Sequence, residues 1–340
     1  MAQPSKQASG NRKVFDKAGE TKPENGSGKK GEKVQMVRVQ RAHDGQRVDN
    51  YLMRELKGVP RSRIYRFIRR GEVRINKKRC KPETKLQQGD QLRIPPYTGS
   101  ESREVAKLQP GLRDYLLDNI LFEDDQVLVV NKPTGLAVHG GSGIRLGLIE
   151  ALRQIKPEWK ALELAHRIDR DTSGCVVVSK KSIFLKHIQR EFKAKTISKT
   201  YLALVHGAWP QEVKAVDAPL KKTEIKEGEK VVRVSEEGKP SFTGFTVLEN
   251  FKAATLLEAR PETGRTHQIR VHCQHAGHAI VGDDRYTQNG ADGRLGAVDN
   301  LCLHAWKIEF SVPDKAENIS VEAPVDGHLE GLISKLKNSD

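Results

Sequence analysis

Cysteine is scarce in this sequence of 340 residues, and its four thiols, Cys80, Cys175, Cys273 and Cys302, lie far apart. They form no C-x-x-C pair, which argues against a zinc ribbon or a dithiol redox site. We therefore expect reduced, mostly buried thiols in a cytoplasmic protein. No apolar run reaches membrane-spanning length and no signal-peptide core follows Met1, so we expect neither a membrane protein nor a secreted one.

Signature motifs of several large enzyme classes are missing as well. The sequence has no P-loop, no G-x-S-x-G elbow and no Gly-rich dinucleotide-binding turn between a strand and a helix. Its densest histidine run, His272, His275 and His278, lacks an obvious carboxylate or thiolate to complete a zinc site. These absences predict a protein that uses neither a metal nor an organic cofactor.

Charge is unevenly distributed along the chain. Lys and Arg number 59 against 44 Asp and Glu, which gives a net charge of +15. Residues 44–97 hold fifteen basic and six acidic side chains, whereas residues 98–340 hold 34 of each. Such an excess indicates nucleic acid or an acidic membrane surface as partner, although a merely soluble basic protein has the same composition. Its concentration in one segment predicts a docking module attached to a neutral body.

The first 34 residues are rich in Lys, Gly, Ser, Asn and Gln and almost free of apolar side chains. Such a segment cannot bury enough surface to offset the entropy lost on ordering, so we predict a disordered basic tail over 1–34. It serves either to keep the chain soluble or as an auxiliary RNA contact.

Residues 44–97 have the pattern of a compact unit. Apolar spacing over 48–56 predicts a first helix, and Ser62 is expected to cap a second one that ends at Gly71. Strands are expected at EVRIN and GDQLRIP. The second helix and the following turn interleave apolar and basic residues, which predicts a folded RNA- or DNA-binding face made of Arg61, Arg63, Arg66, Arg69, Arg70, Lys77, Lys78 and Arg79.

The rest of the chain alternates strand and helix patterns. Residues 98–119 are predicted to be a linker with a short helix at GLRDYLLDNI. From residue 120 onward, strands are expected at QVLVVNKP, GCVVVSK, KTYLALVHG, FTGFTVLENF and AATLLEARP, and helices at GLIEALRQI and SIFLKHIQREFKAK. Strand runs with occasional helices favour an α+β sheet fold over a doubly wound one.

Three polar segments are candidates for chemistry. HRIDRDTSG (166–174) lies just before an apolar strand, where a loop held by buried structure can carry function, although a charged loop with internal salt bridges is the alternative. TYLALVHG (200–207) begins a strand with Tyr201, a position typical of a half-buried packing residue. TGRTHQIRVH (263–272) makes a turn and then a dense polar run.

These three segments, in this order, resemble signature segments of the pseudouridine synthase family that acts on large-subunit ribosomal RNA. ILFEDDQVLVVNKPTGLAVHGGSG resembles the family's opening motif, and LCLHAWKIEF its closing strand. The basic unit over 44–97 resembles the S-four-type RNA-binding domain, so the resemblance covers roughly 44–330. Departures are slight: Ile168 stands where Leu is usual, and GDDRYTQNG differs after Tyr286, which puts the contacts of that loop in doubt.

The resemblance implies a fold and an activity. The fold is α+β, with a mainly antiparallel mixed-sheet pseudouridine synthase domain over 120–330 preceded by a small S-four-type domain. The activity is the isomerisation of specific uridines in large-subunit (23S) ribosomal RNA, which is thus the expected partner. We further expect a cytoplasmic monomer.

The resemblance also assigns roles to residues. Asp169, the Asp of H-R-I-D, is implied to be the catalytic carboxylate, either as a nucleophile or by removing a ribose proton. Arg265 is implied to pair with it, and Tyr201 to stack on the uracil and to take the final proton from carbon five. His166 and Gln268 are expected to contact the substrate.

Two alternatives stay open at this point. Arg167, beside Asp169, is expected either to fill the space that a flipped base leaves or to form a structural salt bridge to Asp171. The chain as a whole is either the isomerase or a catalytically silent RNA-binding factor of ribosome assembly or translation. The S-four-type domain alone would suffice for such a factor, but three matching segments would then have no explanation.

Overall fold

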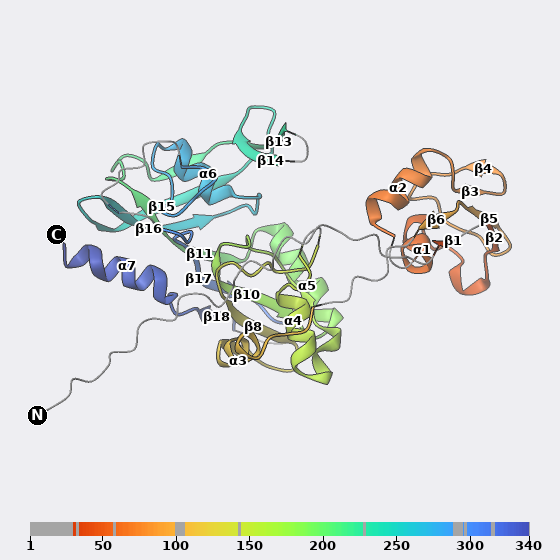
Figure 1. The fold of residues 1–340 in the computed structure, drawn as a ribbon, viewed down its shortest axis with the longest axis horizontal. Coiled ribbons are helices and arrows are strands. Elements are labelled where there is room, and N and C mark those ends of the chain that lie inside the picture. Colours follow the sequence, from red (N-terminus) through yellow and green to blue (C-terminus); the bar gives the residue numbers. More distant parts are fainter. Residues whose placement is uncertain are drawn as a thin grey trace, which may run out of the picture. The chain divides into compact units, whose positions relative to one another are not determined.

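The fold is known from a computed structural model that describes residues 30–31, 34–56, 59–98, 106–141, 144–226, 229–287, 295, 298–313 and 317–339 (Figure 1). The chain divides into two compact units, and the boundary between them falls after Ala106. Most of the predicted disordered tail, and residues 99–105 of the predicted linker, lie outside the described residues. Within the tail, Lys30–Gly31 form strand β1, which pairs with β6 (Tyr97–Thr98) and corrects the prediction of disorder there.

The smaller unit packs two helices on a four-stranded sheet of order β2-β5-β3-β4. Apolar side chains of both helices and of the sheet form its core, as their helical spacing predicted. The elements are β2 (Gln35–Arg38), a 3₁₀ turn (Arg41–His43), α1 (Val48–Glu55), α2 (Arg61–Arg69), β3 (Arg74–Ile75), β4 (Lys78–Arg79) and β5 (Gln91–Ile94).

Local backbone geometry explains two differences from prediction in this unit. Helix α2 begins at Arg61 directly after Pro60, so Ser62 lies inside the first turn and is not the cap. The predicted strand EVRIN shrinks to two residues because Asn76 and Lys77 take φ values of 48° and 66° in the turn to β4. Gly71 ends α2 as predicted, with a φ of 69° that favours glycine.

The larger unit is built on a ten-stranded mixed sheet of order β12-β15-β16-β11-β17-β10-β8-β7, to which β18 and β9 add at β17 and β10. Every pair in it is antiparallel except β10 with β17, so the predicted α+β class with a mainly antiparallel mixed sheet is confirmed. The strands are β7 (Ile120–Glu123), β8 (Val127–Lys132), β9 (Glu163–Leu164), β10 (Ser173–Ser179), β11 (Ser198–His206), β12 (Ala215–Asp217), β15 (Phe242–Asn250), β16 (Ala254–Pro261), β17 (Leu303–Phe310) and β18 (Ile319–Glu322).

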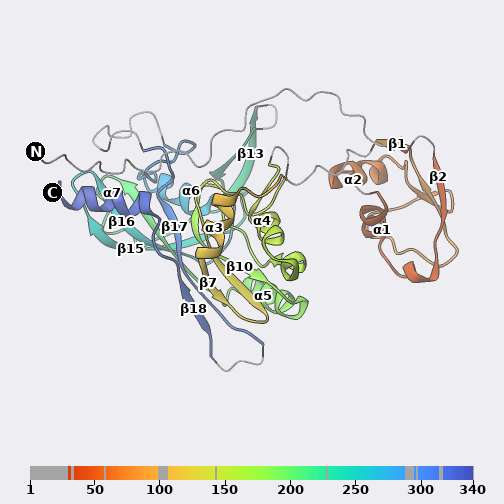
Figure 2. The ribbon, with the colours of Figure 1, turned by 60° about the horizontal axis from the view of Figure 1, so that its bottom comes forward.

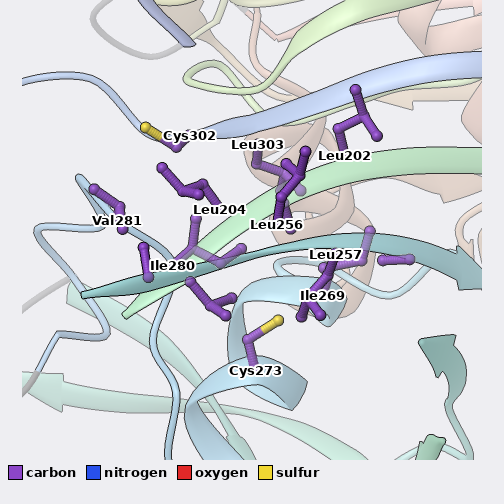
Figure 3. Close-up of a cluster of buried hydrophobic side chains, with 14 of the residues drawn as sticks. Leu202, Leu204, Leu256, Leu257, Ile269, Cys273, Ile280, Val281, Cys302 and Leu303 are labelled. Atoms are coloured by element: carbon purple, nitrogen blue, oxygen red, sulfur yellow. The ribbon is translucent and has the colours of Figure 1, made fainter. Parts of the chain in front are cut away.

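Strands β8 and β10 are buried on both faces, which explains their unbroken apolar runs. Leu128 and Val176 face α3 (Pro110–Asp118) and α4 (Leu148–Ile155), whereas Val129 and Val177 face α5 (Ser182–Ala194). At the other end of the sheet, β11, β16 and β17 pack against α6 (Gln268–His275) and α7 (Gly327–Lys337), as Figure 3 shows for part of this cluster.

Several elements of the larger unit carry no strong pattern in the sequence. Helix α6 falls within a polar run, and α7 begins where the Asp326 carboxylate accepts the N–H groups of His328 and Leu329. Strands β13 (Leu220–Lys226) and β14 (Glu229–Val234) form a separate antiparallel ribbon that lies beside α6 and extends beyond the main sheet (Figure 2).

Candidate active site

The three polar segments singled out in the sequence meet at one cavity of about 570 Å³ in the larger unit. Strand register brings them together. Ser173 of β10 and Leu202 of β11 both lie opposite His304 of β17, so the loop before β10 and the start of β11 reach the same level of the sheet. Tyr201 lies opposite Ala259 of β16, which places the end of β16 and the turn into α6 at that level too.

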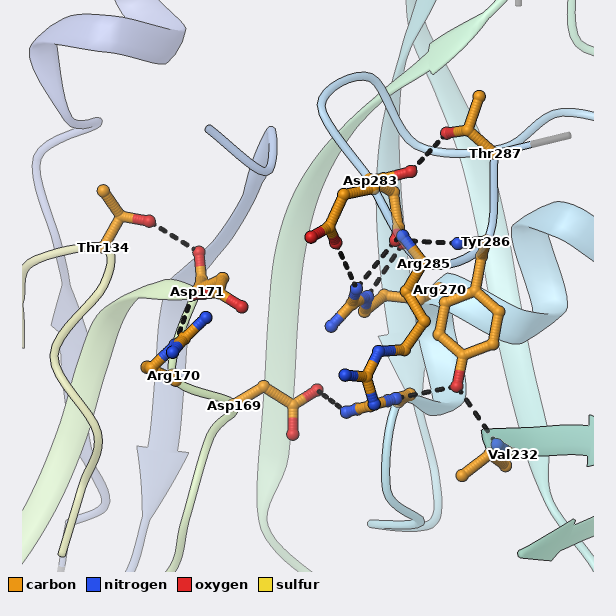
Figure 4. Close-up of polar contacts among 12 residues, drawn as sticks. Thr134, Asp169, Arg170, Asp171, Val232, Arg270, Asp283, Arg285, Tyr286 and Thr287 are labelled. Carbon is orange, nitrogen blue, oxygen red and sulfur yellow. Dashed lines mark hydrogen bonds and ion pairs between the residues drawn. The ribbon is translucent and has the colours of Figure 1, made fainter. Parts of the chain in front are cut away.

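Asp169 lies in the loop between β9 and β10, and buried groups hold that loop in place. The fully buried Lys132 ammonium, at the end of β8, donates to the carbonyls of Pro133 and Arg170 at 2.8 and 2.9 Å. The Thr134 hydroxyl donates to the Asp171 carbonyl at 2.7 Å (Figure 4). Burial lowers the pKa of Lys132 to about 7, against the opposing effect of the carboxylates in the same loop.

His267 faces Asp169 across the cavity, with Nε2 3.9 Å from Oδ2. Its Nδ1 lies 2.7 Å from the Tyr286 hydroxyl, and that hydroxyl oxygen also accepts the N–H of Val232 at 3.3 Å. We assign the Tyr286 proton to the bond with Nδ1, and this assignment puts the ring N–H at Nε2, directed at Asp169. Burial lowers the pKa of His267, although Asp169 opposes the shift, so the ring is neutral near pH 7.

Arg270 supplies the fixed positive charge near Asp169. Its guanidinium is 4% exposed and makes two hydrogen bonds to the fully buried Asp283, at 2.7 and 2.8 Å. It also lies over the Tyr286 ring, 5.2 Å from the ring centre. Burial opposes its charge, but the hydrogen bonds to Asp283 and the charges of Asp283 and Asp169 keep the pKa of Arg270 above its usual value.

Arg265 does not occupy the place that the sequence predicted for it. It makes no ion pair with Asp169 among the described residues, and its Nε donates instead to the Pro240 carbonyl at 3.2 Å on the exposed rim. The reason is helical phase. Arg265 lies in the turn before α6, whereas Arg270 lies one turn beyond His267 and shares its inward face.

Gln268 is part of the scaffold and does not present free polar groups to the cavity. Its Oε1 accepts from the Thr263 hydroxyl and the Arg265 N–H, and its Nε2 donates to the Phe242 carbonyl and the Thr243 hydroxyl. Its hydrogen-bonding capacity is thus used inside the protein, contrary to the predicted substrate contact.

His166 lines the cavity but directs one ring nitrogen into the fold. Its Nε2 accepts the Val177 N–H at 2.9 Å, and its ring packs on Phe192. Burial, with the charge of Lys199, lowers the pKa of His166 to about 4, so the ring is neutral. A hydrogen bond to the Arg167 backbone engages the ring as well, so the substrate contact predicted for His166 stays a prediction.

Arg167 lies exposed at the cavity rim, and its side chain makes no hydrogen bond or ion pair with any described residue. The predicted salt bridge to Asp171 is wrong, because Arg170 occupies that carboxylate at 2.8 Å. The remaining prediction, that Arg167 fills the space left by a flipped base, is compatible with its position.

Tyr201 is half-buried between two apolar clusters and lines the cavity. Burial raises its pKa, and the nearby charge of Asp169 adds to the shift. The side chain is thus a neutral phenol whose ring forms part of the cavity wall.

The predicted nucleic-acid-binding residues of the smaller unit are exposed, except for Arg63, which is half-buried over the Phe67 ring. Arg63, Arg66 and Arg70 share one face of α2 at the spacing i, i+3, i+7 and line a hollow of about 480 Å³. The remaining five residues lie on neighbouring surface, at Arg61, Arg69, Lys77, Lys78 and Arg79.

Two further observations concern the described part of the chain. No cluster there brings three or more histidine, cysteine or acidic side chains together as metal ligands. The histidine run is dispersed, since the buried His272 bonds to Ser241 and Thr243 in the core. Among the described helices, none combines the length and the apolar character needed to cross a membrane.

The sequence of this chain matches known protein families and individual relatives. The sequence model of a family described as RNA pseudouridylate synthase matches residues 126–275, and that of the S4 domain matches residues 46–92. The chain is 50% identical over 312 residues to ribosomal large subunit pseudouridine synthase C of Escherichia coli (strain K12), which covers 90% of this chain and 98% of that relative. The protein of the same name from Haemophilus influenzae is 47% identical over 309 residues, with 90% and 96% covered.

Solved structures agree. Human RNA pseudouridylate synthase domain containing 4 matches with a TM-score of 0.55 at 26% identity, over 67% of this chain and 96% of its own. Human RNA pseudouridylate synthase domain containing 1 gives 0.53 at 26% identity, over 68% and 98%. Identity of about half over nearly the whole length of the bacterial relatives shows that the chain belongs to the RNA pseudouridylate synthase family, with an S4 domain before its synthase domain.

Proposed function

We propose that this protein isomerises specific uridines of large-subunit (23S) ribosomal RNA to pseudouridine, with Asp169 as its catalytic carboxylate. Its relatives carry the name ribosomal large subunit pseudouridine synthase C, and we infer the same C-type activity here. The observation that carries the proposal is the placement of Asp169 in the cavity, opposite His267 and within the field of the buried Arg270.

The reaction breaks the bond between uracil N1 and ribose C1′, rotates the base and rejoins it through C5. Atoms and electrons balance within one nucleotide, since the C5 proton leaves and N1 gains one. An ionised carboxylate can start this sequence as a nucleophile toward the base or ribose, or as a base toward a ribose proton. Both routes need Asp169 charged and partly desolvated, and Arg270 favours that state.

Tyr201 is suited to stack on the uracil, since its ring is part of the cavity wall. Its raised pKa keeps it a phenol in the resting site. For Tyr201 to take the C5 proton, it must first pass its own proton on, and Asp169 is the nearby carboxylate that can accept it.

The target uridine must leave its RNA stack to reach Asp169, which costs a few kcal/mol. Arg167, free at the rim, fills the vacated space in this proposal. Docking of the RNA falls to the arginines of α2 and the lysines of the following turn. We expect the enzyme to act as a monomer in the cytoplasm, where ribosomal RNA is found in bacteria.

The test compares Asp169→Asn with Asp171→Asn, measured as tritium released from C5 of labelled uridine in ribosomal RNA transcripts. Asp169→Asn keeps the shape but removes the charge, so it should bind RNA within a few-fold of wild type and release no tritium. Asp171 lies in the same loop, where it is half-buried and pairs with the exposed Arg170, so its variant should keep substantial activity. Turnover by pure Asp169→Asn would overturn the assignment. A wild-type protein that binds RNA but never forms pseudouridine would favour the catalytically silent factor.

A further inference from the structure

Lys199 is a cation without a partner at the wall of the cavity. It lies on β11 two residues before Tyr201, and both side chains line the cavity. The Lys199 side chain is half-buried and makes no hydrogen bond or ion pair with any described residue. The charge that acts on it is that of Lys195, of the same sign, and burial together with that charge lowers the pKa of Lys199 to about 8.

Buried or half-buried ammonium groups in folded proteins are normally paired, because removing an unpaired charge from water is costly. Here the neighbours add positive charge. Lys193 and Lys195 line the same cavity, and the acidic partner of Lys195 is Glu262, at 3.8 Å in an exposed pair that contributes little. This wall of the cavity therefore carries an uncompensated positive charge that an anionic ligand would stabilise.

We propose that Lys199, assisted by Lys195 and Lys193, forms a binding subsite for a phosphodiester of the RNA backbone next to the flipped uridine. This inference rests on the proposed function. Uracil and ribose carry no formal charge, so the phosphates bonded to that ribose are the anions that the nucleotide brings into the cavity. With C1′ held at Asp169 and the base against Tyr201, one flanking phosphate faces the lysine wall. Lysine suits this task as a point charge that needs no fixed approach angle.

The test is a double-mutant cycle in which one charge is removed from the protein, one from the RNA, and then both together. The RNA is a fragment that the wild-type protein converts, compared with the same fragment carrying an uncharged methylphosphonate on the 5′ or the 3′ side of the target uridine. Lys199→Met keeps most of the side-chain length and removes the charge, and Lys199→Arg keeps the charge. Lys186→Met is the matched control, since Lys186 is exposed on helix α5 and does not line the cavity.

We expect Lys199→Met to weaken binding of the unmodified RNA roughly tenfold, the value for loss of one charge-assisted hydrogen bond. Wild-type protein should lose about the same factor with the methylphosphonate on one side, and Lys199→Met should lose almost nothing more. Lys199→Arg should restore most of the affinity, and Lys186→Met should match wild type. Lys195→Met, whose side chain is exposed, repeats the cycle without a risk to folding and should show a smaller effect of the same kind.

Two results would overturn the subsite. One is a methylphosphonate penalty that is as large in Lys199→Met as in wild type, and the other is unchanged affinity in both lysine variants. Failure of the proposed function looks different, because wild-type protein would then form no pseudouridine in any ribosomal RNA fragment.

Discussion

Tyr286 lies outside the cavity, yet the structure gives it control over the group that faces Asp169. Tyr286→Phe removes one oxygen atom and keeps the ring that packs on Arg270 and Val232. Without the hydroxyl, Nδ1 of His267 loses its proton donor, and the ring can adopt the tautomer whose Nε2 lone pair points at the Asp169 carboxylate.

The size of the effect follows from the bond that is lost. One neutral hydrogen bond contributes about 1 kcal/mol, within a range of about 0.5–1.5 kcal/mol. If that preference for one tautomer is needed in the transition state, kcat falls roughly fivefold, since about 1.4 kcal/mol corresponds to a factor of ten. KM should stay close to wild type, because Tyr286 is 3% exposed and does not line the cavity.

The pH profile is the readout that a merely structural role would not move. His267 is surrounded by Asp169, Asp283, Arg270 and Arg285, and burial lowers its pKa. Protonation would pair it with Asp169 and weaken that carboxylate as a catalyst, so wild-type kcat falls as the pH drops through this lowered pKa. In the variant Nδ1 no longer accepts a proton from a hydroxyl and is easier to protonate, so the acidic limb moves to higher pH.

Single-turnover tritium release between pH 5 and pH 8 measures both effects. Tyr115→Phe is the control, since it also removes a phenolic oxygen from the larger unit but has no hydrogen bond to His267. The tautomer argument would be refuted if Tyr286→Phe had the same kcat as wild type and the acidic limb of its pH profile stayed at the same pH.

Two other predictions concern docking and stability. Arg66→Gln with Arg70→Gln removes two charges from one hollow of α2, so the slope of log affinity against log salt should become shallower by about 1.5 units in RNA-binding titrations. Asp283→Asn leaves the buried Arg270 without its main partner, which should lower the free energy of unfolding of the larger unit by about 3–5 kcal/mol in a urea titration.

Each of these two predictions has an outcome that would contradict it. Arg38→Gln with Lys85→Gln removes the same charge from exposed positions of the smaller unit that do not line the hollow. An equal change of slope in both double variants would show that only net charge matters and that the α2 hollow is not the docking surface. Wild-type stability of Asp283→Asn would show that Arg270 finds full compensation elsewhere.

The sequence by itself determined the sheet and the location of the chemistry. Unbroken apolar runs predicted β8 and β10, which are buried on both faces, and an alternating, mostly apolar run predicted β11. Short polar motifs marked the loop of Asp169 and the start of β11 at Tyr201, and the structure brings both to one cavity. These features are local, because a strand pattern and a loop motif are each contained within about ten residues.

Only the tertiary structure decided which polar side chains face Asp169. Helix α6 escaped prediction because the polar Gln268, Arg270 and His272 are buried beside Ile269, Val271 and Cys273, so polar and apolar residues alternate where a helix normally shows a clear apolar face. Their burial is compensated by groups far away in the chain, such as Asp283 for Arg270. The same holds for the choice of Arg270 over Arg265 and for the isolation of Lys199, since a partner, or its absence, is a property of three-dimensional neighbours that no short sequence window contains.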